Sequence, residues 1–364
     1  MGVPFNDLGR ALDPIWGDVY RSLKGCVERV QFLRGPMVKR FEEEFAKAVG
    51  AMRAVAVSSG TDAIALSLRA LGIRGGESVY TPAFGCPATA AAIAQAGGIP
   101  RFVDVGRESG LATADAYAAL YGEGEPAAVV PVHLFGRLAE VRDVKRLSSR
   151  TAVVEDCCQA FGTPGAGRHG DAAAWSTYPS KNLGAWGDGG VVTTDDPDIA
   201  DDVARLRHYG ADETWQVERF GWNARMDEIQ AAVLLAKMPY VQRWHQQRAR
   251  AAALYRLLLP PALLGRWAGA ENLHLMPIRV HDRPAFREAL AARGIQTGVH
   301  YERSLPSLAA CGGDDSAFPE AAAWAREEVS LPMFPGIRDS EVRAVCDAVR
   351  ESVQKLVDRR PVRA

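Results

Sequence analysis

The chain has 364 residues, of which 48% are hydrophobic and 24% charged, and its formal net charge is −1. This length exceeds what one ordinary core holds, so two domains are expected, and the composition is typical of a globular protein in water. The near-zero charge, with basic and acidic residues interspersed, argues against a nucleic-acid binder.

Membrane, secreted and metal-binding classes are also disfavoured. No apolar run reaches the ~18 positions that a membrane helix needs. The first 16 residues carry Asp and Pro where a signal peptide has a basic and then an apolar stretch. The cysteines form no C-x-x-C pair and have no His at zinc spacing: Cys26, Cys86, Cys157, Cys158, Cys311 and Cys346. We expect a cytoplasmic protein with no membrane segment and no metal.

Between about residues 50 and 240, short apolar runs alternate with Ala/Leu-rich helical stretches. Strands that are apolar throughout and separated by helices are typical of a parallel sheet covered on both faces. The sequence thus predicts a three-layer α/β domain, in which ligands gather at the carboxyl ends of the strands. The expected strands are Ala54–Val57, Ser78–Thr81, Arg101–Val105, Ala128–Val132, Ala152–Glu155, Ala174–Thr177 and Val191–Thr194.

A smaller α+β domain is expected beyond a long helix that starts near residue 230 and stops at Pro260-Pro261. Its predicted elements are a strand over 273–280, a helix over 283–294, a short strand over 297–301 and two further helices, before a disordered tail over 359–364. We therefore expect a large domain of residues 1–245 and a small domain of residues 246–364. Residues 1–30 are expected to form an N-terminal segment that packs on the small domain.

Three clusters carry candidate chemistry, and the first is Ser58-Ser59-Gly60-Thr61-Asp62, which follows the first strand and opens a helix. Small residues let the backbone approach a ligand, and free N–H groups at a helix start bind anions. An ordinary N-cap is the alternative, and taken alone the cluster favours it.

The second cluster places Asp156 at the end of an apolar strand, within the stretch Val153–Gln159. A buried acid there needs a cationic or hydrogen-bonding partner. A pyridinium nitrogen is such a partner, because holding it protonated lets a cofactor ring accept electrons. Metal ligation is the rival interpretation, and the segment holds no His to support it.

The third cluster, Ser176–Gly184 with the glycine-rich stretch 187–190, contains Lys181 just past a strand. The chain has seven lysines, and most of the others are expected on solvated helical faces. An amine in a confined site with a lowered pKa suits Schiff-base chemistry. The glycines lack the G-x-G-x-x-G spacing of a dinucleotide site.

In their order these motifs resemble the DegT/DnrJ/EryC1/StrS family of sugar aminotransferases. The resemblance runs from about Pro4 to Val349 and implies a large domain of pyridoxal-phosphate (PLP) fold type I with a mostly parallel seven-stranded sheet. It is carried by SSGTDAI (58–64), EDCCQAFG (155–162), STYPSKNLGAWGDGG (176–190), GWNARMDEIQAA (221–232), GIQTGVHY (294–301) and SLPMFPG (330–336).

The resemblance assigns roles by position. Lys181 matches the lysine that carries PLP as a Schiff base and shuttles the substrate proton. Asp156 matches the acid that pairs with the pyridine nitrogen, and Gln159 matches the residue beside the ring hydroxyl.

The resemblance also implies a phosphate site and a homodimer. Gly60, Thr61 and Ser176 match residues that hold the cofactor phosphate. Asn223 matches a residue that reaches this phosphate from the partner subunit, so the active sites would be shared.

Substrate contacts are implied for Arg225, His300 and Tyr301. Arg225 matches a position that can meet a carboxylate or a diphosphate, and an ion pair with Asp227 or Glu228 is an equal alternative. After Tyr301 the chain departs from the family's Pro-x-Pro-Leu-His, and that segment lines the substrate entrance.

Two departures concern the cofactor. Cys86 stands where many relatives place an aromatic residue that stacks on the ring. Phe84 is a candidate substitute, and poorer cover of the ring is the alternative. Phe161 stands where relatives often have His.

The sequence therefore predicts a PLP-dependent transaminase that moves an amino group from an amino acid to a keto-sugar. We expect L-glutamate as the amino donor and a nucleotide-linked keto-sugar as the acceptor. A keto-cyclitol of the scyllo-inosose type is an alternative acceptor that shares every motif. Dehydratases of this family replace the lysine with His, so Lys181 argues against them. A non-catalytic regulatory member is expected to lose Lys181 or Asp156, and neither is lost.

Overall fold

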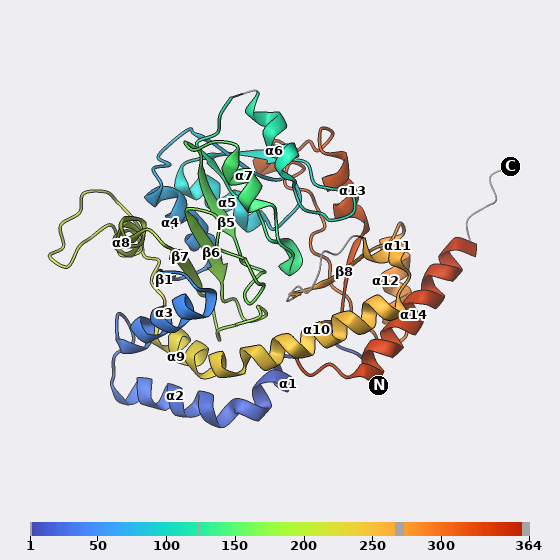
Figure 1. Cartoon of the computed structure of the whole chain (residues 1–364). Helices are drawn as coiled ribbons and strands as arrows, with labels where there is room; N and C mark the ends of the chain where they lie inside the picture. Colours follow the sequence, from blue (N-terminus) through green and yellow to red (C-terminus); the bar gives the residue numbers. More distant parts are fainter. Residues whose placement is uncertain (1, 123, 266–272, 359–364) are drawn as a thin grey trace.

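A computed structural model describes residues 2–122, 124–265 and 273–358. Its centre is a seven-stranded sheet of order β1-β7-β6-β5-β4-β2-β3 (Figure 1). All strands run the same way except β7, which is antiparallel to β1 and β6. The strands are β1 (Arg53–Val57), β2 (Ser78–Pro82), β3 (Ile99–Val103), β4 (Ala128–Val129), β5 (Ala152–Asp156), β6 (Ala172–Ser176) and β7 (Gly190–Thr194). The predicted three-layer α/β domain is confirmed.

Helices cover both faces of this sheet, which explains why its strands are apolar throughout. In β1, Val55 and Val57 are buried in the cluster beneath α4 (Gly60–Ala70), α5 (Pro87–Ala96) and α8 (Pro197–Leu206). Ala56 between them is buried on the other side, with α2 (Trp16–Glu28), α3 (Pro36–Val49) and α9 (Glu228–Lys237). Successive side chains of a strand point to opposite faces, so each position must be apolar.

The remaining helices connect the strands or build the C-terminal part. They are α1 (Leu8–Leu12), α6 (Ala114–Tyr121), α7 (Val141–Arg146), α10 (Val241–Leu258), α11 (Pro261–Leu264), α12 (Arg283–Ala291), α13 (Pro319–Glu327) and α14 (Asp339–Asp358). Short 3-10 helices are η1 (Asp13–Ile15), η2 (Leu134–Gly136), η3 (Met238–Tyr240) and η4 (Ala309–Cys311).

The single long helix predicted from residue 230 onward is wrong. Instead α9 ends at Lys237, the short η3 carries Pro239, and α10 continues to Leu258 (Figure 1). Proline has no N–H to donate to the preceding turn, so the helix breaks there.

The proposed domain boundary at 245/246 falls inside α10. Trp244 packs in the cluster beneath the sheet, whereas Ala251 and Tyr255 pack with the C-terminal elements. The boundary remains our proposal.

The C-terminal part is built around a two-stranded antiparallel sheet of β8 (Met276–Arg279) and β9 (Glu328–Leu331). Here the sequence prediction was partly wrong, because residues 297–301 form no strand and contribute only a bridge from Gly298 to Ser330. Gly298 passes close to the Phe5 ring, which lies 2.7 Å from where a Cβ would stand. The strand that was missed is β9. The predicted tail over 359–364 lies outside the described residues.

The first part of the N-terminal segment reaches the C-terminal elements. Val3 forms a bridge with Ile295, and Arg10 donates two hydrogen bonds, of 2.7 and 2.9 Å, to the Glu341 carboxylate. Farther along, α2 packs on α9. The segment thus spans both parts of the molecule.

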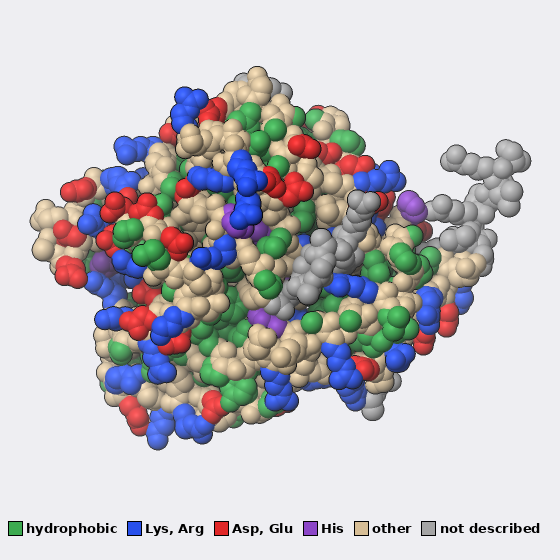
Figure 2. Space-filling model, in the orientation of Figure 1, with side chains coloured by type: hydrophobic (Ala, Val, Ile, Leu, Met, Phe, Trp, Pro, Cys, Tyr) green, Lys and Arg blue, Asp and Glu red, His purple; other side chains and the backbone are tan. Residues whose placement is uncertain are grey.

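The surface carries charges of both signs side by side on the face drawn in Figure 2. This agrees with the net charge of −1. Among the residues that the structure describes, no helix has the length and apolar character needed to cross a membrane.

Candidate active site

A cavity of about 250 Å³ opens at the edge of the sheet where the parallel strands end. Seven of the residues predicted to bind the cofactor line it: Gly60, Thr61, Cys86, Asp156, Gln159, Ser176 and Lys181. Asp156 and Ser176 end β5 and β6, and the others come from the segments that follow β1, β2, β5 and β6, so the parallel topology gathers them. Tyr301, predicted to contact substrate, lines the same cavity from the C-terminal part of the chain.

Asp156 is the last residue of β5 and is held by two donors. It is only 4% exposed. The Thr89 hydroxyl donates to Oδ2 at 2.8 Å, and the Cys158 N–H donates to Oδ1 at 3.0 Å. The two hydrogen bonds fix the orientation of the carboxylate at the end of the strand. Sequence reasoning missed Thr89, whose signal was a lone hydroxyl near the start of an otherwise Ala-rich helix.

The start of α4 combines an ordinary N-cap with a closely packed glycine in the cavity wall. The Ser59 hydroxyl accepts the N–H of Asp62 at 3.0 Å, which caps the helix. The N–H groups of Gly60 and Thr61 belong to the first turn, where backbone donors lack helical partners. A Cβ at Gly60 would lie 2.8 Å from both Cys158 Sγ and the Ser176 Cβ. Only glycine therefore fits this wall.

Gln159 and Tyr301 are linked across the cavity. The Gln159 side chain accepts the Phe135 N–H at 2.6 Å, which fixes its amide, and its Nε2 then donates to the Tyr301 hydroxyl at 2.9 Å. Burial raises the pKa of Tyr301 well above its usual range, so the phenol stays protonated. Phe84 does not face this cavity and packs instead on Phe135 and Trp324. The suggestion that Phe84 replaces the stacking aromatic is therefore wrong.

Two histidines that feel the charge of Lys181 have lowered pKa values. Lys181 is half-buried in the loop after β6. Burial and then the Lys181 charge lower the pKa of His300 to about 4, and the same two effects lower that of His274. His300 does not line the cavity. Its ring stacks on Phe5 and its Nδ1 lies 3.0 Å from the Ser330 hydroxyl.

Lys237 corrects the expectation for the other lysines. It lies on a helix as expected, but it is only 6% exposed and its Nζ donates to the Gly184 carbonyl. Burial lowers its pKa to about 8. The chain therefore holds a buried lysine with a lowered pKa on a helix, which a helical position in the sequence does not reveal.

Asn223 and Arg225 lie outside the cavity, on a neighbouring surface. Asn223 is exposed, and its Oδ1 accepts from Arg225 Nε at 3.0 Å. Within the described residues, Arg225 forms neither of the alternative ion pairs, with Asp227 or with Glu228. The Glu228 carboxylate instead accepts the N–H groups of Gly35, Met37 and Val38.

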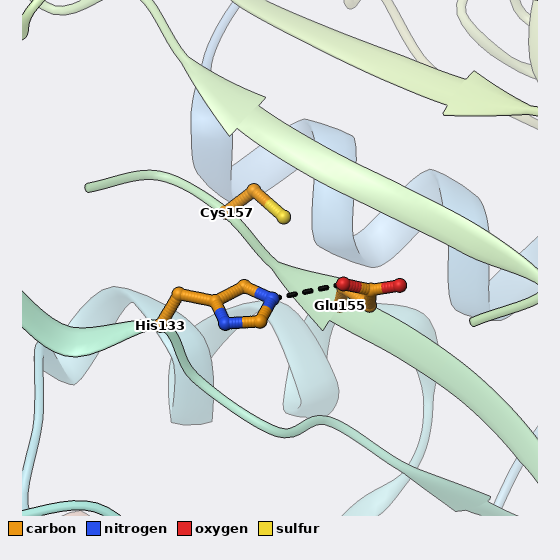
Figure 3. A group of neighbouring side chains, drawn as sticks. All are labelled: His133, Glu155 and Cys157. Carbon is orange, nitrogen blue, oxygen red and sulfur yellow. Dashed lines mark hydrogen bonds and ion pairs between the residues drawn. The ribbon is translucent and has the colours of Figure 1, made fainter. Parts of the chain in front are cut away.

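One group of potential metal ligands converges in the described part of the chain: His133, Glu155 and Cys157 (Figure 3). Hydrogen bonds account for it. His133 Nδ1 accepts the Ala139 N–H at 2.9 Å, so Nε2 carries the proton and donates to Glu155 at 2.8 Å. With both ring nitrogens occupied, this histidine has no lone pair left for an ion. The absence of a metal from the active site remains a prediction.

The cavity offers what PLP requires. Backbone N–H groups at a helix start suit its phosphate, a buried carboxylate suits a protonated pyridine nitrogen, and a lysine amine suits its aldehyde. All three groups lie on the walls of this one cavity.

Comparisons with known proteins agree with this chemistry. The model of the DegT/DnrJ/EryC1/StrS aminotransferase family matches residues 17–350. A dTDP-3-amino-3,4,6-trideoxy-alpha-D-glucose transaminase of Streptomyces venezuelae is 33% identical over 97% of each chain. A pleiotropic regulatory protein of Geobacillus stearothermophilus is also 33% identical, over 96% of this chain and 98% of its own. The solved structure of S. venezuelae DesV, in complex with a ketimine intermediate, is similar with a TM-score of 0.92 and 34% identity, covering 97% of this chain and 99% of that one.

Proposed function

The chain belongs to the DegT/DnrJ/EryC1/StrS aminotransferase family, and from this premise we propose that it moves the amino group of L-glutamate to a nucleotide-linked keto-sugar. It is a sugar aminotransferase of PLP fold type I, and its cofactor is PLP. The names of several relatives, which act on dTDP- and UDP-linked sugars, support a nucleotide-linked acceptor. We propose the cytoplasm as its compartment.

One observation carries the proposal: Lys181, Asp156 and the start of α4 share a single cavity. Bound PLP supplies an electron sink that lets a carbon–hydrogen bond next to nitrogen ionise. Lys181 is proposed to tether the cofactor and then to take up and return the proton at that carbon. Asp156, oriented by its two donors, is proposed to hold the proton on the pyridine nitrogen.

The remaining walls are proposed to orient the cofactor. The first-turn N–H groups of Gly60 and Thr61, with the Ser176 hydroxyl, would bind the phosphate. Gln159 would approach the ring hydroxyl, and its bond to Tyr301 would keep it there. Since Cys86 offers no ring, Tyr301 contributes the aromatic surface in this part of the wall.

We further propose a homodimer with shared sites, in which Asn223 serves the cofactor phosphate of the partner subunit. Its exposed position outside the cavity of its own chain supports this. Mixing a Lys181→Ala protein with a strongly impaired Asn223 variant tests it. After subunit exchange, half of the dimers are mixed and have one intact site, so activity should recover to about a quarter of wild type. No recovery, with exchange shown independently, would exclude a shared site.

The acceptor is tested by a screen on glutamate-treated protein. Glutamate should bleach the absorption band of the lysine-bound cofactor, and the true acceptor should restore it. We expect nucleotide-linked keto-sugars to restore the band and keto-cyclitols not to. Recovery with a keto-cyclitol alone would favour the alternative acceptor.

A regulatory role is the second candidate, because one relative is named a pleiotropic regulatory protein. The presence of both Lys181 and Asp156 supports the enzyme instead. A protein that binds PLP but whose band does not respond to glutamate or to any other amino acid would favour the regulatory role.

A further inference from the structure

A second, smaller cavity shares Lys181 with the active-site cavity. Its volume is about 50 Å³, against about 250 Å³ for the active-site cavity. Lys237 and Arg248 line it together with Lys181, so three cationic side chains surround one small space. No acid is found among the described residues that form its wall.

Two of these cations are buried without a counter-charge. Lys237 is 6% exposed and Arg248 is 3% exposed. Lys237 donates to the Gly184 carbonyl, and Arg248 Nη1 donates to the carbonyl oxygens of His274 and Met333, both at 3.1 Å. In the part of the chain that the structure describes, neither cation pairs with a carboxylate. Burial lowers the pKa of Arg248 to about 10. A buried charge normally has a partner of opposite sign, because removing it from water is costly.

Two N–H groups of the same wall also lack an acceptor. Arg248 Nε and the indole Nε1 of Trp186 are buried, and neither has a hydrogen-bond partner within the described residues. Both atoms can only donate. Buried donors without an acceptor are rare in native proteins because they are costly. The wall therefore combines positive charge with unused donors.

Apolar side chains complete the wall. Leu8 and Leu12 of α1 and Trp244 of α10 line the cavity. The Trp186 ring stacks on Trp16, with 5.3 Å between the ring centroids, which holds the indole in place. In such apolar surroundings the attraction between opposite charges is stronger than in water.

We propose that this cavity binds a chloride ion, held by Lys237, Arg248 and Trp186. Chloride accepts hydrogen bonds without donating any, and it carries the missing negative charge. A buried water makes about three hydrogen bonds and must also place its own hydrogens on acceptors, so it suits a wall of donors less well. The cavity of about 50 Å³ leaves room for a small ion, since one water needs about 10–15 Å³, whereas pockets for small organic molecules start at about 300 Å³.

The ion would lie next to the loop that carries Lys181. This loop is closed by the Ala185 N–H, which donates to the Thr177 carbonyl at 2.7 Å, and Lys237 binds it at Gly184. A chloride bound to Lys237 would therefore offset positive charge beside the active-site lysine. The site depends on neither the amino donor nor the acceptor proposed above.

Bromide-soaked crystals of the PLP-loaded protein test the site directly. Bromide has the charge of chloride and scatters X-rays anomalously at its absorption edge. We expect an anomalous peak in the cavity, within hydrogen-bond distance of Lys237 Nζ and Arg248 Nε. Density in the cavity without an anomalous signal would mean water and would overturn the proposal.

Thermal unfolding of the PLP-loaded protein measures the affinity in solution. Chloride is varied at constant ionic strength, with gluconate as the replacement anion. We expect the Tm to rise with chloride and then to level off slowly, as mass action requires for a ligand of the folded state. A Tm that responds alike to chloride and gluconate would overturn the proposal.

Three variants distinguish the site from general attraction. Lys237→Met, which removes a charged donor but keeps the chain length, should raise the dissociation constant of chloride at least about tenfold. Trp186→Phe, which keeps a ring but loses the N–H, should raise it about two- to tenfold, and it keeps the proposal testable if Lys237→Met does not fold. Lys47→Met, which removes an exposed lysine, should change it less than about twofold. A dissociation constant that Trp186→Phe leaves unchanged, or that Lys47→Met raises as much as Lys237→Met, would overturn the proposal.

Discussion

Glu155→Gln should destabilise the protein far more than an isosteric substitution usually does. The Glu155 carboxylate is fully buried and accepts four hydrogen bonds. Oε1 accepts the N–H groups of His169 and Gly170, both at 2.6 Å, and Oε2 accepts the Gly167 N–H and His133 Nε2, both at 2.8 Å. A glutamine oxygen can replace Oε1, but its NH₂ group would then face two donors.

The magnitude follows from those two lost acceptors. A hydrogen bond to a charged group contributes about 1.5–3 kcal/mol, so the loss is about 3–6 kcal/mol. With an unfolding entropy of about 2.1 cal/mol/K per residue, each kcal/mol lowers the Tm of a chain or domain of this size by about 1–2 °C. We expect Glu155→Gln to lower the Tm by about 3–12 °C.

Differential scanning calorimetry at pH 7 measures this, with Glu140→Gln as the matched control. Glu140 is exposed and accepts one backbone N–H, from Ala114, which a glutamine oxygen can also accept. The control should change stability by less than about 1 kcal/mol. If Glu155→Gln behaves like the control, the carboxylate is not the ionised acceptor of four bonds described above.

The Glu155 carboxylate also makes the stability of the protein depend on pH in the acidic range. Burial alone would raise the pKa of Glu155, but the hydrogen bond from His133, with those from the N–H groups of Gly170 and His169, outweighs it and lowers the pKa. The folded state therefore favours the ionised form. Its contribution to stability is present above the unfolded pKa of about 4.3 and is lost as the pH falls through the lower folded value.

Three further predictions concern other sites. Asp156→Asn should lower turnover at least about 100-fold, because a neutral side chain no longer holds the pyridinium proton; near-normal turnover would assign that role elsewhere. Burial raises the pKa of Glu328 to about 8. Between about pH 4.5 and 8 the folded state therefore keeps a proton that the unfolded state has released, so the stability of the protein falls as the pH rises through this range. Glu328→Gln should flatten this part of the Tm–pH profile, and an unchanged slope would refute the shift. Arg10→Ala should destabilise the protein by about 1–2 kcal/mol at pH 7, because Glu341 loses the hydrogen bonds from Arg10 that lower its pKa. The difference in stability between wild type and variant should shrink as Glu341 is protonated in acid. A difference that does not depend on pH would contradict an ionic bond.

The large domain could be predicted from the sequence because its signals are local. An apolar run followed by small and polar residues and then an Ala-rich stretch describes β1, the start of α4 and α4 itself. The parallel arrangement then brings the ends of the strands together, so that residues as distant as Gly60 and Lys181 meet in one cavity. The topology of the sheet therefore brings together residues that lie in separate sequence motifs.

What the sequence did not reveal depends on contacts between distant segments. The burial of Lys237 depends on which side of α9 meets the Gly184 loop. The bond between Tyr301 and Gln159 joins residues 142 positions apart, from the C-terminal part of the chain and the sheet edge. The break at Pro239 was visible in the sequence, but the apolar pattern on both sides of it favoured one helix.

Borohydride reduction of the PLP-loaded protein, followed by peptide mapping, tests the central claim most directly. The structure offers two lysines as candidates, since Lys237 is buried with a lowered pKa and Lys181 lines the cavity with Asp156. We predict one pyridoxyl label per chain, on Lys181, and no label in a folded Lys181→Ala variant. A label on Lys237, or on any lysine other than Lys181, would contradict the active site described above.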